Sequence, residues 1–90
     1  MNCIGLDAHS ASFMMAVLNK SGKVMQCVSR PTSGENLIEL VSGVPGPKEL
    51  VVEESELAQW VKDTLSPYVD RLVVCDPRRN RRIAKEDFSD

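Results

Sequence analysis

The sequence lacks the long apolar runs that carry a chain into a membrane. No stretch approaches the roughly 18 consecutive apolar residues of a membrane-spanning helix, and the opening MNCIGLDAHS has no basic region ahead of an apolar one. A secretory signal peptide is therefore not predicted. Internal repeats and low-complexity tracts are missing too, which excludes repeat architectures and compositionally biased chains.

Cysteine pairs at metal-binding spacing are also missing. Cys3, Cys27 and Cys75 are widely spaced, and no C-x-x-C pair occurs. An odd number of thiols in apolar runs is typical of a reduced chain, and a buried thiol usually acts as a small hydrophobic group. We therefore expect a cytoplasmic protein without a thiolate metal centre.

A large excess of one charge is absent. The 11 basic and 13 acidic residues leave a net charge of −2, which argues against a dedicated nucleic-acid-binding domain. Basic residues nevertheless gather in one segment that contains no acidic residue: Arg78, Arg79, Arg81, Arg82 and Lys85. Such a segment can contact phosphates locally, or it can be a solvated helix face.

What is present is typical of one small folded domain. The 90 residues are 42% hydrophobic and 27% charged, as in ordinary globular chains. A chain of this length accommodates a single core. We therefore expect one domain over residues 1–90.

The first third of the chain predicts three strands joined by tight turns. Short apolar runs occupy residues 3–6, 13–18 and 23–28, a pattern that favours strands. The connection Asn-Lys-Ser-Gly at 19–22 is typical of a hairpin. The succession predicts an antiparallel meander, in which Met14, Met15 and Met25 pack within the sheet.

A helix is predicted after the meander. Thr32-x-x-Glu35 has the form of a capping box, in which a hydroxyl and a carboxylate satisfy the first amide groups of a helix. Leu37, Leu40 and Val41 then recur at helical spacing. Gly43 and the prolines that follow it end the helix.

A second helix is predicted between two further strands. Ser55 is the expected cap of this helix, and Trp60 is expected on its core-facing side at helical spacing. The flanking strands are predicted from the β-branched apolar runs at residues 50–52 and 72–75.

The order β-β-β-α-β-α-β predicts an α/β fold with a mixed sheet. Strand–helix–strand connections give parallel pairs and the meander gives antiparallel ones. By analogy, this order matches the ribonuclease-H-like folds, a mixed sheet with flanking helices in which the first and fourth strands are parallel neighbours. The chain stops soon after the last strand, so the expected fold is incomplete at its C-terminus.

Two carboxylates end the first and fourth strands, at Asp7 and Glu53. Adjacent strands lie about 5 Å apart, so like charges there need compensation, which a divalent cation such as Mg²⁺ supplies. With a phosphate substrate, such a site orients a nucleophile and stabilises the leaving oxygen. The alternative is structural: Asp7 caps a turn, and Glu53 or Glu54 lies favourably at the start of a helix.

Four motifs carry a family resemblance: IGLDAH from residue 4, SGK from residue 21, VVEES from residue 51 and VVCDPRRN from residue 73. Together they resemble the N-terminal RuvC-like domain of the DEDD-type insertion-sequence transposases, relatives of the Piv/MooV DNA invertases. The resemblance covers essentially the whole chain, which would be the N-terminal portion of a longer transposase.

This resemblance implies a ribonuclease-H-like catalytic domain with four acidic residues and Mg²⁺ or Mn²⁺, and a separate domain with a serine nucleophile. It implies phosphodiester cleavage and strand transfer in DNA transposition and recombination. It further implies DNA and a structured guide RNA as partners, a homo-oligomer in the full-length protein, and a bacterial or archaeal cytoplasm. The basic residues between positions 78 and 85 would bind DNA phosphates.

Carried over by position, the first two family acids fall on Asp7 and Glu53, which would be catalytic residues and metal ligands. Glu54 is the adjacent alternative to Glu53. Asp87 and Asp90 have the spacing of the final acidic pair, but they follow the Asp-Pro motif too closely. The true pair is therefore expected beyond residue 90, and the chain alone is expected to be inactive.

Two other interpretations remain open. Sugar- and acetate-kinase-like ATPases also begin with a strand, an Asp and a hairpin, but they place a small Gly shortly after the Asp for close phosphate approach, where this chain has His9. His9 is either a proton shuttle or phosphate donor, or a solvated turn residue. The second interpretation is a truncated, inactive transposase remnant that binds nucleic acid or associates with itself.

Overall fold

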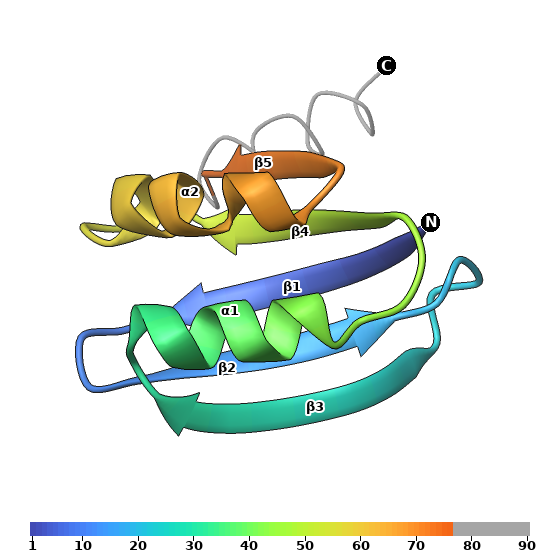
Figure 1. Cartoon of the computed structure of the whole chain (residues 1–90), viewed down its shortest axis with the longest axis horizontal. Helices are drawn as coiled ribbons and strands as arrows, with labels where there is room; N and C mark the ends of the chain where they lie inside the picture. The colour runs from blue at the N-terminus through green and yellow to red at the C-terminus, as the bar shows by residue number, and fades with distance from the viewer. Residues whose placement is uncertain (77–90) are drawn as a thin grey trace, which may run out of the picture.

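A mixed five-stranded sheet with β1 at its centre organises the chain. A computed structural model describes residues 1–76, and their sheet has the strand order β3-β2-β1-β4-β5 (Figure 1). The elements, in chain order, are β1 Asn2–Ala8, β2 Ser12–Leu18, β3 Val24–Pro31, α1 Gly34–Ser42, β4 Lys48–Glu53, α2 Ala58–Leu65, the 3₁₀ turn η1 Ser66–Tyr68, and β5 Arg71–Cys75.

The pairing directions confirm the predicted topology. β1 pairs antiparallel with β2, and β2 pairs antiparallel with β3, which is the predicted meander. β4 pairs parallel with β1 and β5 pairs parallel with β4. The α/β class with a mixed sheet is therefore confirmed. Among the helices of residues 1–76, none combines the length and hydropathy that spanning a bilayer requires.

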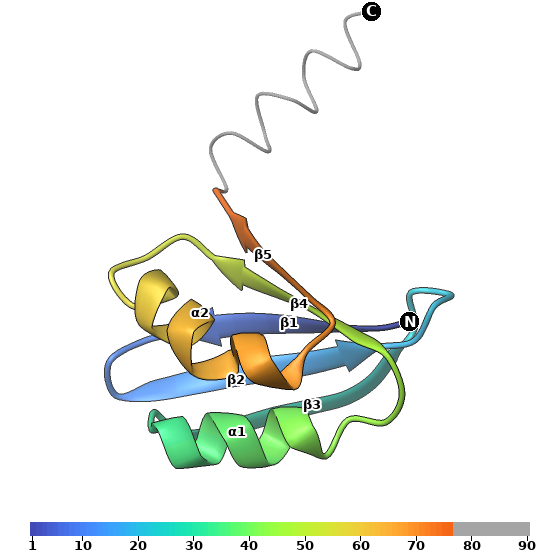
Figure 2. The same cartoon turned by 45° about the horizontal axis from the view of Figure 1, so that its top comes forward.

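One face of the sheet carries the core. Both helices pack on this face (Figure 2), because side chains alternate between the two faces of a strand. In β1, the residues Ile4, Leu6 and Ala8 are buried beneath the helices. α1 contributes Leu37 and Val41 to the same core, and α2 contributes Val61 and Leu65.

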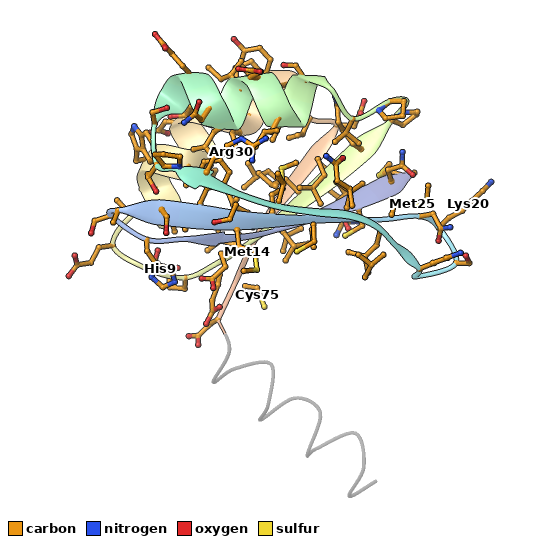
Figure 3. The ribbon with its side chains drawn as sticks, turned by 90° about the horizontal axis from the view of Figure 1, so that it is seen from below. His9, Met14, Lys20, Met25, Arg30 and Cys75 are labelled. Atoms are coloured by element: carbon orange, nitrogen blue, oxygen red, sulfur yellow. The ribbon has the colours of Figure 1, made fainter. Side chains whose placement is uncertain are left out.

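The opposite face of the sheet carries a row of small side chains. The row runs across all five strands, through residues paired in register: Cys27, Ala16, Gly5, Val51 and Val73. Figure 3 shows Met14 and Cys75 on the side of the sheet away from α1. Within residues 1–76, both helices lie on the other side, so no helix of this part of the chain covers the row.

Several packing predictions were wrong. Met15 is buried as expected, but Met14 and Met25 are exposed, because they fall on the uncovered face or on the irregular edge strand β3. Trp60 is 37% exposed rather than core-facing. The buried positions of α2 include Ala58 and Val61, and Trp60 precedes Val61 by one residue, which turns its side chain about 100° away.

The predicted caps were also misplaced. Ser33 is the N-cap of α1 and accepts a hydrogen bond from the Asn36 N–H at 3.0 Å, whereas Thr32 bonds elsewhere. Ser55 accepts the Leu57 N–H at 3.2 Å in the turn before α2, and α2 itself has no side-chain cap.

Candidate functional site

Asp7 and Glu53 end two neighbouring parallel strands on the same face of the sheet. Each directly follows the paired residues Leu6 and Val52 in the β1–β4 register. They therefore lie at adjacent strand ends, about 5 Å apart at the backbone. The predicted proximity of these two carboxylates follows from the parallel pairing of β1 and β4.

Asp7 is also in contact with His9. The His9 Nε2 lies 3.1 Å from Asp7 Oδ1, and both side chains are more than half exposed. Exposed pairs of this kind contribute little to stability. The contact instead holds the imidazole beside the carboxylate, at the edge where β1 turns toward β2.

The turn between β1 and β2 has a defined shape. The His9 N–H donates to the Ser12 carbonyl at 3.0 Å and closes the turn. From outside the hairpin, the Thr32 hydroxyl donates to the His9 carbonyl at 2.6 Å, and the Thr32 N–H donates to the Ala11 carbonyl at 3.1 Å. The hydroxyl that the sequence pattern assigned to a helix cap therefore holds this turn.

A pocket of about 310 Å³ lies between this turn and the connection from β4 to α2. It is lined by Ala8, His9, Ser10, Ser55, Glu56 and Leu57. Its position, outside the carboxyl ends of parallel strands β1 and β4, is where open α/β sheets bind ligands. An imidazole, two serines, the carboxylate of Glu56 and the start of a helix line this space.

A second hollow of about 390 Å³ lies on the uncovered face. Gly5, Ala16 and Val51 form its floor, and Asp7 and Glu53 border it at the carboxyl edge. The hollow exists because the central residues have small side chains; a Cβ built on Gly5 would meet nothing within 4 Å. Asp7 and Glu53 therefore face this hollow.

The donor set fits a weakly held hard cation rather than a complete metal centre. In the part of the chain that the structure describes, no three His, Cys, Asp or Glu residues are grouped to hold a metal ion. Two carboxylates are a common protein contribution to Mg²⁺ when a substrate phosphate supplies further oxygens. Asp7 and Glu53 fit that role.

Cys75 borders the hollow at this edge, whereas Cys3 is placed away from it. Cys3 lies at the far end of β1, where burial and the charge of Glu49 raise the pKa of its thiol. A raised pKa lowers the thiolate fraction, and the thiolate is the reactive form.

The other predicted site residues are placed differently. Glu54 follows Glu53 and donates its backbone N–H to the Cys75 carbonyl at 2.7 Å; the alternation of side chains along β4 sets it apart from Asp7. Seven further predicted residues lie outside the described residues: Arg78, Arg79, Arg81, Arg82, Lys85, Asp87 and Asp90.

Sequence reasoning missed three residues at this edge: Ser10, Thr32 and Ser55. Ser10 and Ser55 line the pocket, and Thr32 holds the turn beside it. The signal for Ser10 and Ser55 was their place within three residues of the strand-ending acids Asp7 and Glu53. Thr32 gave no local signal, because its partner is 23 residues away.

No protein-family model matches the chain, and no curated protein matches it significantly in sequence. Solved structures do match. The ethanolamine utilization protein EutJ from Carboxydothermus hydrogenoformans is similar over 84% of this chain, with a TM-score of 0.55 and 10% identity. The Aquifex aeolicus member of the Ppx/GppA family is similar over 88%, with a TM-score of 0.50 and 16% identity.

These two structures have the actin-like ATPase fold, and this chain shares its fold with part of each of them. The chain spans 36% of the length of each of these two structures. At 10% and 16% identity, the likeness establishes the fold alone.

The likeness to an actin-like ATPase corrects the family assignment. The neighbours are not transposases or RuvC-like nucleases, so the predicted DNA-transposition and recombination function and the insertion-sequence, RuvC-like and ribonuclease-H-like labels were wrong. The remnant interpretation finds no clear support either. The motifs misled the assignment for a physical reason. All four are apolar strands that end in acids or turns, and sheets of this topology in other families can have the same pattern at their carboxyl edge.

Proposed function

We propose that this chain forms one wall of a site for an oligophosphate, such as the phosphate chain of a nucleotide, bound together with Mg²⁺. The observation that carries the proposal is the pocket between the β1–β2 turn and the start of α2. It lies at the carboxyl edge of parallel strands in a fold of the actin-like ATPase type. The kinase-like ATPase interpretation of the sequence is the one that this proposal develops.

The pocket offers groups that suit phosphate oxygens. The Ser10 and Ser55 hydroxyls and the His9 imidazole are hydrogen-bond donors at its rim. The first turn of α2 begins beside the pocket without a side-chain cap, and the dipole of the helix places a partial positive charge at this end.

Asp7 and Glu53 would hold the cation. Two neighbouring carboxylates repel one another, and a chelated Mg²⁺ relieves the repulsion while it bridges to phosphate oxygens. Mn²⁺ prefers the same oxygen ligands. His9, at 3.1 Å from Asp7, would be displaced from this carboxylate or would turn toward the phosphate.

Other expectations stay predictions. A single domain over residues 1–90, a cytoplasmic location and a homo-oligomer in a longer protein are not tested by the fold. The DNA and guide-RNA partners, which rested on the transposase resemblance, are likewise untested.

The experiment is a ¹H–¹⁵N NMR titration of the full chain with ATP and with tripolyphosphate, each with and without Mg²⁺. One wall of a site binds weakly, so we expect dissociation constants near 1 mM, or about −4 kcal/mol. Shifts should concentrate at His9, Ser10 and Ser55, and they should be larger with Mg²⁺.

The matched variants are Asp7→Asn and Asp63→Asn. Asp63 is exposed on α2 and accepts a hydrogen bond from the Gln59 side chain at 2.9 Å. We expect Asp7→Asn to remove the Mg²⁺ enhancement and Asp63→Asn to leave it unchanged. Absence of binding by the unmodified chain, or equal behaviour of the two variants, would overturn the proposal.

A further inference from the structure

Thr32 ties the β1–β2 turn to the segment ahead of α1. Its hydroxyl and its N–H bond the carbonyls of His9 and Ala11, at 2.6 and 3.1 Å. These bonds join two parts of the chain that are 23 residues apart. The carbonyl groups on one side of the turn are therefore already occupied.

Occupying the His9 carbonyl also sets the direction of the Ser10 N–H. The two groups belong to one planar trans peptide, in which the C=O and N–H point in opposite directions. Since Thr32 holds the carbonyl side, the Ser10 N–H points away from Thr32. Ser10 is one of the residues that line the pocket.

Thr32 is itself well anchored. The Asn36 side chain donates to the Pro31 carbonyl at 2.8 Å, and the Asn36 N–H donates to Ser33 Oγ at 3.0 Å. The residues on both sides of Thr32 are thus fixed to the first turn of α1. The threonine acts as a bridge from a helix within the core to a turn at the rim of the pocket.

We propose that Thr32 is a positioning residue, which fixes the β1–β2 turn so that the Ser10 N–H is presented to a phosphate oxygen. This inference rests on the proposed function for the ligand, and on the hydrogen bonds of the turn for the positioning. Thr32 itself touches no ligand, since its two polar groups are already engaged by the turn.

The test compares Thr32→Val, Thr32→Ser and Thr64→Val in the full chain. Thr32→Val removes the hydroxyl and keeps a β-branched side chain, Thr32→Ser restores a hydroxyl, and Thr64→Val makes the same change on α2. Losing one well-aimed hydrogen bond to a charged ligand corresponds to roughly a tenfold loss of affinity. We expect this loss for Mg²⁺–tripolyphosphate in Thr32→Val only, with Thr32→Ser close to the unmodified chain.

A second measurement separates this inference from the proposed function. Amide hydrogen exchange at His9 and Thr32, whose N–H groups are bonded in the turn, reports the turn directly when it is followed by NMR without ligand. We expect faster exchange in Thr32→Val and near-normal exchange in Thr32→Ser. If the unmodified chain binds no phosphate, the proposed function fails, and the exchange data still decide whether Thr32 holds the turn.

The outcomes that overturn the inference are distinct. Unchanged exchange in Thr32→Val shows that the hydroxyl does not hold the turn. Faster exchange with unchanged tripolyphosphate affinity shows that the turn is held but does not position a ligand group. A loss of affinity that Thr32→Ser fails to restore shows a packing effect rather than a hydrogen bond.

Discussion

The amine of Lys48, the first residue of β4, donates to the Val44 carbonyl at 2.8 Å, just past the end of α1. It also donates to the Val41 carbonyl at 2.8 Å. These carbonyls lie at the negative end of the α1 dipole, and that of Val41 also accepts the Val44 N–H at 3.1 Å. One side chain therefore links the end of a helix to the start of the next strand.

Replacing this amine should destabilise the protein. We expect Lys48→Met, which keeps the apolar stem, to lower the free energy of unfolding by about 1–2 kcal/mol, since two partly buried carbonyls lose a charged donor. Urea denaturation measures the change. Lys62→Met, at an exposed position of α2, is the control. An equal effect of the two substitutions would contradict the assigned role of Lys48.

The β2–β3 turn depends on Asn19. Its side-chain oxygen accepts the N–H groups of Ser21 and Lys23, each at 3.0 Å, and the Ser21 hydroxyl at 2.8 Å. We expect Asn19→Ala to cost about 1 kcal/mol, because such local bonds define the turn. Thermal unfolding measures it, with Lys20→Ala in the same turn as control; a larger loss in the control would refute the role.

Gly22 supports the same turn through its backbone. Its φ of +84° is a conformation that residues with a Cβ rarely adopt. We expect Gly22→Ala to lower the free energy of unfolding by about 1 kcal/mol, although a Cβ there meets nothing within 4 Å. Gly5→Ala is the matched control, with open space and an ordinary strand conformation, and it should be neutral or stabilising.

Truncating Leu37 should destabilise the protein more than truncating Trp60, although Trp60 has the larger side chain. Leu37 is fully buried, whereas Trp60 is 37% exposed. We expect Leu37→Ala to cost about 2–4 kcal/mol through the cavity it leaves, and Trp60→Ala to cost less. Chemical denaturation of both variants tests this. A larger loss of unfolding free energy for Trp60→Ala would show that the Trp60 side chain packs in the core.

Thiol reactivity should follow burial and charge. Burial, followed by the charge of Glu49, raises the pKa of the Cys3 thiol, so less thiolate is present near pH 8. We expect an aromatic disulfide reagent to modify exposed Cys27 before Cys3. Glu49→Gln should lower the Cys3 pKa and speed its reaction, without changing that of Cys27. Equal Cys3 rates in both proteins would exclude the contribution of Glu49.

Periodicity predicted the topology because alternation and helical spacing follow from backbone geometry. The meander and the parallel β1–β4 pair were predicted in this way, and so was the proximity of Asp7 and Glu53. The exposure of Trp60 was not predicted. A shift of one residue along a helix rotates a side chain by about 100°, and packing decides which residues of the helix face the core. The sequence also did not decide whether Thr32 or Ser33 caps α1, because both have a hydroxyl. The His9 carbonyl, which is distant in sequence, engages the Thr32 hydroxyl and leaves Ser33 as the cap.

Family assignment failed for a different reason. Many α/β sheets have an apolar strand followed by an acid at their carboxyl edge. Asp7 and Glu53 therefore indicate the topology of the sheet rather than membership of one family. The resemblance therefore described the fold correctly at the level of strand order and wrongly at the level of chemistry.

The central position of β1 has a consequence for biosynthesis. β1 leaves the ribosome well before its parallel partner β4, in which Lys48 pairs with Asn2. At about 5–20 residues per second, that partner emerges a few seconds later. Until then, β1 is paired with β2 on one side only, and its other edge has unpaired backbone groups. The nascent chain needs protection during that interval, because strands of other chains can pair with this edge.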